Sequence, residues 1–174
     1  TALLLLAAVT SSRYEDGDKL LAALNGKPVL EHSGALDLFA GAQPRIAVVP
    51  SSSSPRSDVL TAQGWSIVSN PNARDGQSTS LVSAIDAVQS NSEIDQVIVL
   101  LGDMPNVPAA HLNAMSKLAE HRQISAIISE SDGVLSPPAL FKREHFDALS
   151  QLKGDQGAKS VFLSLETGRA TVQL

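Results

Sequence analysis

Apolar runs alternate with amphipathic stretches along the whole chain, a pattern typical of α/β folds. Residues 3–9 and 96–101 are apolar at nearly every position and predict strands that are buried on both faces of a sheet. Shorter apolar runs predict further strands at residues 45–49, 65–68 and 124–129.

Segments with helical spacing separate these strands. Leu81, Ile85 and Val88 lie on one face of a helix predicted for residues 78–88. Other helices are predicted for residues 19–39 in two pieces, for the segment that opens at Pro108, and for residues 145–152 and 155–164. Residues 133–141 contain two prolines and are predicted to be irregular or an edge strand. Crossovers of this kind predict a mostly parallel sheet covered on both faces.

The composition excludes several classes of function. The 174 residues carry a net charge of -5 and include no Cys, which excludes disulfides, a thiolate zinc site and a cysteine nucleophile. The acidic balance argues against nucleic acid as a partner. Only 3% of the residues are aromatic, so the core must be built from aliphatic side chains.

No segment of the sequence predicts a membrane protein. The apolar run at residues 2–9 is too short to span a bilayer, and no cationic segment precedes it as in a signal peptide. We therefore expect one cytoplasmic domain over residues 1–174, with no membrane partner. Because the chain begins with Thr1 and ends inside an alternating pattern, we expect it to lack terminal residues of the full protein.

Ligands of open parallel sheets bind beyond the carboxyl ends of the strands. This rule selects three polar loops, at residues 9–18, 69–77 and 102–107. Neither G-x-x-x-x-G-K-[ST] nor G-x-G-x-x-G occurs in the chain, which argues against a P-loop ATPase and a dinucleotide-binding domain.

The first loop offers hydroxyls and two cations close to a helix start. Ser11, Ser12, Arg13 and Lys19 would suit a polyphosphate if they converge there. The alternative is a solvated surface loop whose cations are neutralised by the acidic residues between them. From the residues alone, both interpretations stay open.

Asp103 follows the clearest strand of the sequence, where a carboxylate suits Mg²⁺ that is also bound by phosphates. A turn aspartate bonded to its own backbone is the alternative, and the cationic first loop favours the metal interpretation. The loop that begins at Asn70 offers amides and hydroxyls for a nucleobase edge, or simply caps for the following helix. The histidines lie on separate segments without metal-ligand spacing, and we expect surface or interface positions for His32, His111, His121 and His145.

Four segments together resemble the MobA-like nucleotidyltransferase family, and within it the molybdenum cofactor cytidylyltransferases. The first is LLLLAAVTSSRYEDGDKLLAALNGKPVLEHS at residues 3–33, which is similar to the family's strand, phosphate loop, lysine and helix start. The others are NPNARDGQSTSLVSAIDAV at residues 70–88, VIVLLGDMPNVP at 97–108 and SPPALFKREHFDALSQLKGDQGAK at 136–159. They occur in the family's order over nearly the whole chain.

The resemblance implies a Rossmann-like three-layer α/β/α fold and an enzyme that transfers a nucleotide from a nucleoside triphosphate, CTP being favoured. The implied acceptor is phosphorylated, with molybdopterin the first choice, and pyrophosphate is released. The resemblance assigns the triphosphate to Arg13 and Lys19 and Mg²⁺ to Asp103, and these three form the implied catalytic set. Implied nucleotide contacts are Ala7, Ala8, Ser11, Ser12, Arg13, Lys19, Asn70, Gly76, Ser78 and Ser80.

Three positions depart from the family pattern. Val9 stands where the family has a glycine, Glu15 to Gly17 replaces another glycine, and Ser136 to Pro138 replaces a Gly-His-Pro turn. Two alternatives therefore remain beside the cytidylyltransferase. One is a nucleotidyltransferase for another acceptor, such as a sugar or polyol phosphate. The other is a family member that binds a nucleotide or cofactor without catalysis.

Overall fold

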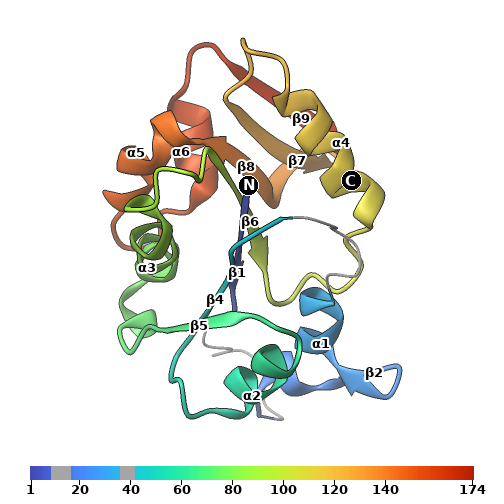
Figure 1. The fold of residues 1–174 in the computed structure, drawn as a ribbon. Helices are drawn as coiled ribbons and strands as arrows, with labels where there is room; N and C mark the ends of the chain where they lie inside the picture. The colour runs from blue at the N-terminus through green and yellow to red at the C-terminus, as the bar shows by residue number, and fades with distance from the viewer. Residues whose placement is uncertain (9–16, 36–41) are drawn as a thin grey trace.

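The computed structural model describes residues 1–8, 17–35 and 42–174. Its main feature is a seven-stranded sheet, in which the described strands all run in one direction except β8 (Figure 1). In order across the sheet, the strands are β5 (Ser66–Ser69), β4 (Arg45–Val49), β1 (Ala2–Leu6), β6 (Gln96–Leu101), β8 (Val134–Lys142), β7 (Ala126–Ser131) and β9 (Arg169–Gln173). This arrangement confirms the predicted mostly parallel sheet.

Helices cover both faces of the sheet, as the apolar strands predicted. One face packs against α1 (Val29–Gly34), α2 (Pro55–Ala62) and α4 (Ala109–Ala119), and the other against α3 (Gln77–Gln89), α5 (Phe146–Ser150) and α6 (Ala158–Ser164). Successive side chains of β1 alternate between the two cores: Leu3 packs with the first group of helices and Leu4 with the second. The three-layer α/β/α fold is thus confirmed.

The segment predicted to be irregular is the long strand β8, which lies inside the sheet between β6 and β7. Its prolines are tolerated because the pairing with β7 jumps from Ala139 to Ser136, so that Pro137 and Pro138 fall in the register shift. Its pairing with β6 ends at Ala139, before the prolines are reached. The edge-strand prediction was therefore wrong.

The prediction of a helix for the first half of residues 19–39 was also wrong. It holds a single 3₁₀ turn, η1 (Lys19–Leu21), followed by a hairpin of β2 (Ala23–Leu24) and β3 (Lys27–Pro28). Asn25 and Gly26 have φ of 52° and 83°, and two consecutive positive φ values suit a two-residue hairpin turn better than a helix.

Two other 3₁₀ turns precede helices: η2 (Ala73–Asp75) before α3, and η3 (Arg143–His145) before α5. Within residues 1–8, 17–35 and 42–174, no helix has the length and apolar character needed to cross a membrane.

Candidate functional site

Strands β1 and β6 lie side by side and bring the end of β1 next to the turn at residues 102–107. The strands pair in parallel as far as Leu6 and Leu101, and the Gly102 N–H donates to the Leu6 carbonyl at 2.9 Å. The chain thus leaves both strands at the same level, at the carboxyl edge where ligands of parallel sheets bind.

Lys19 and Asp103 meet at this edge, although 84 positions separate them in sequence. The Lys19 Nζ donates to Asp103 Oδ2 at 3.1 Å, and the two side chains remain 51% and 40% exposed. An ion pair this exposed contributes about 0–1 kcal/mol to folding. Both charged groups therefore face solvent at the rim with little of the fold depending on their pairing.

Gly102 lets the backbone before Asp103 pass close to neighbouring side chains. A Cβ at this position would lie 3.1 Å from Leu30 Cδ1, 3.2 Å from Leu20 Cδ1 and 3.3 Å from Ala7 Cβ. The absence of a side chain lets β6 end close beneath η1, the turn that carries Lys19.

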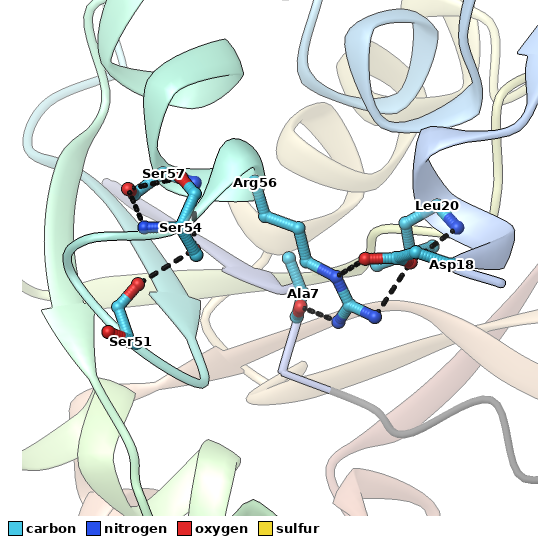
Figure 2. Close-up of polar contacts among 7 residues, drawn as sticks. All are labelled: Ala7, Asp18, Leu20, Ser51, Ser54, Arg56 and Ser57. Atoms are coloured by element: carbon cyan, nitrogen blue, oxygen red, sulfur yellow. Dashed lines mark hydrogen bonds and ion pairs between the residues drawn. The ribbon is translucent and has the colours of Figure 1, made fainter.

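A buried arginine that the sequence analysis did not single out lies next to this rim. The Arg56 Nε and Nη2 donate to the two carboxylate oxygens of Asp18, at 2.6 and 2.8 Å, and Nη1 donates to the Ala7 carbonyl (Figure 2). Asp18 is the N-cap of η1, and its Oδ1 also accepts the Leu20 N–H at 3.0 Å. One side chain thus connects β1, η1 and α2.

Local sequence explains why Arg56 points inward. Ser54 caps α2 in a capping box with Ser57, and Pro55 occupies the first turn of the helix (Figure 2). Because α2 follows β4 at the carboxyl edge of the sheet, Arg56 reaches Asp18 from the edge where Lys19 and Asp103 lie.

The predicted contacts Ser11, Ser12 and Arg13 lie outside the described residues, as do Val9 and Glu15. Ala7 and Ala8 are fully buried at the end of β1. Of the predicted triphosphate ligands, the described part of the chain contains Lys19 alone.

Asn70 lies at the centre of the loop before α3, and every polar atom of its side chain is bonded. Its Nδ2 donates to Thr79 Oγ1 and Ser80 Oγ, at 2.9 and 3.0 Å, and its Oδ1 accepts the Asn72 N–H. Asn70 and the predicted contact Ser80 are both 3% exposed, so the structure brings them to each other inside the loop.

Gly76 and Ser78 hold this loop against a later segment. Gly76 has φ +125°, and a Cβ there would lie 2.2 Å from the Gly154 carbonyl oxygen, which accepts the Ser78 N–H at 3.1 Å. An open, polar hollow beside it is lined by Asn72, Thr79 and Lys153 among others. The loops at residues 70–78 and 150–154 thus form one rim beside the N-terminus of α3.

The histidines were predicted to lie at surface or interface positions, but His111 is buried within the fold, with 5% of it exposed. The Gln173 carbonyl accepts from its Nδ1 at 3.1 Å, and its Nε2 lies 2.7 Å from Ser129 Oγ. Burial lowers the pKa of His111, and the contact with Gln173 partly opposes this shift.

The described residues include no group of three or more His, Cys, Asp or Glu side chains that could hold a metal ion. Asp103 is nevertheless an exposed carboxylate at the strand end. A single carboxylate of this kind fits Mg²⁺, which usually retains waters and shares its coordination with substrate phosphates.

A curated protein is similar to part of this chain. It is the purine catabolism protein PucB of Bacillus subtilis strain 168, with 32% identity over 108 residues. The match covers 62% of this chain and 51% of PucB, so it spans about half the length of that relative.

Solved structures share the fold over 99% of the chain. Rv0371c of Mycobacterium tuberculosis H37Rv has a TM-score of 0.81 at 22% identity, with 87% of it covered, and its manganese complex has 0.73 at 20% identity, with 86% covered. CMP:2-keto-3-deoxy-manno-octonic acid synthetase complexed with CTP has a TM-score of 0.73 at 15% identity, with 89% covered.

A family model for the MobA-like NTP transferase domain matches residues 3–169. This range includes Lys19 and Asp103 at the edge of β1 and β6, and the loops beside α3. The chain therefore belongs to the MobA-like NTP transferase family, whose members are nucleotidyltransferases.

Proposed function

We propose that this protein is a Mg²⁺-dependent nucleotidyltransferase that transfers CMP from CTP to a phosphorylated acceptor, molybdopterin, with release of pyrophosphate. The observation that carries the proposal is the meeting of Lys19 and Asp103 at the carboxyl edge of β1 and β6. A cation and a carboxylate at one exposed rim are the two groups that a metal-bound triphosphate requires.

The reaction needs no nucleophile from the protein. An oxygen of the acceptor phosphate forms a bond to the α-phosphorus of CTP, and the bond from that phosphorus to the bridging oxygen breaks. The electron pair leaves with pyrophosphate. Because the acceptor phosphate is already ionised near neutral pH, no general base is required.

Lys19 would leave its ion pair with Asp103 and neutralise the phosphate oxygens on which charge develops. Such groups accelerate phosphoryl chemistry by position and charge. Asp103 would hold the metal ion, which supplies charge neutralisation when bound. Because the exposed ion pair contributes little to folding, breaking it to bind ligand costs little free energy.

Similar proteins support the choice of ligands. The synthetase with the same fold has CTP bound, and Rv0371c forms a complex with manganese. Molybdopterin rests on the sequence resemblance to cytidylyltransferases. A sugar or polyol phosphate is the second acceptor class, because the same rim would serve any acceptor that brings its own phosphate oxygen.

The direct test is an assay for released pyrophosphate with CTP, GTP, UTP and ATP, each with molybdopterin or with a panel of sugar and polyol phosphates. We expect CTP with molybdopterin to give the fastest Mg²⁺-dependent release. Removal of either rim charge, in Lys19→Met or Asp103→Ala, is expected to lower kcat/KM by about 100-fold or more.

A matched control is the ion pair between Lys27 and Glu31, which is also exposed and has a distance of 2.7 Å. Lys27→Met and Glu31→Gln should leave kcat/KM unchanged. Turnover that survives in both rim variants, or no turnover by the wild type with any nucleotide and acceptor, would refute the proposed function.

A further inference from the structure

We propose that Arg56 is a positioning residue that sets Lys19 against Asp103 and keeps the carboxylate of Asp18 from competing with the phosphates for Lys19. The inference rests on the proposed function and adds a residue to it. Arg56 acts through its neighbours: its guanidinium donates to both carboxylate oxygens of Asp18 and to the Ala7 carbonyl.

The path from Arg56 to the rim consists of short contacts. Its guanidinium holds both carboxylate oxygens of Asp18, and Asp18 caps the turn that begins with Lys19. Lys19 then reaches Asp103 at 3.1 Å. A bidentate contact with a carboxylate fixes orientation as well as distance, so it also fixes the start of η1 (Figure 2).

Charge gives Arg56 a second effect at the same place. Asp18 is adjacent to Lys19, and without Arg56 its carboxylate would be a free anion next to the cation that we assign to the triphosphate. That anion would compete with the phosphates for Lys19. The Arg56 side chain is 9% exposed, so solvent screens its charge poorly and its pairing with Asp18 is effective.

The contact with Ala7 extends this role to the other end of the first loop. Ala7 lies at the end of β1, before residues 9–16, and Asp18 lies after them. Arg56 therefore ties together the chain on both sides of the segment that contains Arg13. A lysine could satisfy Asp18 but not Asp18 and Ala7 at once, because it lacks the planar fork of nitrogens.

The first test compares Arg56→Met, Lys19→Met and the double variant in the pyrophosphate assay, with rates expressed per folded protein. We expect Arg56→Met to lower kcat/KM by about tenfold or more, and Arg56→Lys to recover part of the loss. In the Lys19→Met background, Arg56→Met should cause little further loss, because its target is already absent.

Arg143 is the matched control. Its guanidinium is also held by backbone carbonyls, those of Gln89, Asn91 and Ile94, but it lies beyond the amino end of β6. Arg143→Met should lower stability while kcat/KM per folded protein is unchanged, and its effect should be independent of Lys19. This separates a positioning role from loss of stability.

A second readout uses the ligand-free protein and does not depend on turnover. The Lys19 side-chain NMR signal, assigned by its loss in Lys19→Met, should shift in Arg56→Met and Arg56→Lys and stay in place in Arg143→Met. An unchanged Lys19 signal, or additive losses of Arg56→Met and Lys19→Met in kcat/KM, would overturn the inference. Failure of the proposed function would instead appear as an inactive wild type with a shifted Lys19 signal in Arg56→Met.

Discussion

Gly76 shows how closely two backbones approach at the rim beside α3. Its φ of +125° is a conformation that side chains rarely adopt, and the Gly154 carbonyl occupies the space of a Cβ. Two independent constraints therefore require glycine at the N-cap of α3. The family resemblance placed Gly76 near the nucleobase, and the structure adds a structural reason for the residue.

We predict that Gly76→Ala lowers the free energy of unfolding by about 3 kcal/mol, because strained backbone and a clash with backbone act together. Chemical denaturation measures the loss. Gly64 is the control, since it has φ +80° but open space around its Cβ position. Gly64→Ala should cost only about 1–2 kcal/mol, and equal losses in the two variants would show that the contact with Gly154 contributes nothing.

Residue type and position at the strand ends were enough to predict that Lys19 and Asp103 would share an edge. The parallel-sheet rule brings both loops together without any knowledge of side-chain geometry. Arg56 could not be found in this way, because its burial depends on the capping of α2 and on Asp18, which lies 38 positions away. Pairings of this kind are three-dimensional and leave no spacing signal.

His111 links three elements, since it lies on α4, contacts Ser129 on β7 and bonds to Gln173 on β9. A carbonyl only accepts, so the His111 Nδ1 carries a proton and donates to Gln173. The Ser129 hydroxyl donates to the Pro138 carbonyl at 2.7 Å, and its oxygen lies 2.7 Å from His111 Nε2. The sequence analysis expected a surface or interface position for His111, and its contacts with β7 and β9 join segments far apart in sequence.

The burial of His111 predicts a pH dependence of stability. Burial lowers its pKa in the folded protein below the ordinary 6.5, so the unfolded chain binds the proton more readily. The stabilisation is present above about pH 6.5 and is lost as the pH falls through the lower folded-state pKa. Urea unfolding from about pH 7.5 to 5.5 should show this fall, and His111→Gln should reduce it.

His121 provides the control for this measurement because it is exposed. His145, whose pKa burial also lowers, contributes a fall in the same direction in every variant. His121→Gln should therefore behave like the wild type, while His111→Gln shows a smaller fall. A fall of equal size in His111→Gln and wild type would contradict the assignment.

The hydrophobic pattern predicted the buried strands more reliably than their positions in the sheet and the turns between elements. The strands predicted from apolar runs at β1, β4 and β6 are confirmed, because a strand buried on both faces admits few polar residues. Strand β8 was predicted to be irregular or an edge strand because of its two prolines. Its position inside the sheet was missed, because a register shift at Ser129 accommodates them. The hairpin of β2 and β3 was missed because apolar residues on both sides of Asn25 also fit a helix.

At the scale of the whole molecule, the alternation of strands and helices was sufficient to predict a three-layer fold and the edge where the site lies. The strand order places β1 inside the sheet, with β4 and β6 on either side of it. This topology collects η1, α2 and the turn at Asp103 at one edge. The central claim is that this edge binds a metal–nucleotide complex.

The most direct measurement of that claim is the gain in unfolding free energy when Mg²⁺ and CTP are added. With nucleotide at 100 times its Kd, the wild type should gain about 2.7 kcal/mol, and the Lys19→Met/Asp103→Ala double variant should gain far less under the same conditions. Lys27→Met should retain the full gain. If the double variant retained it too, or the wild type gained nothing from any nucleotide, the account would be contradicted.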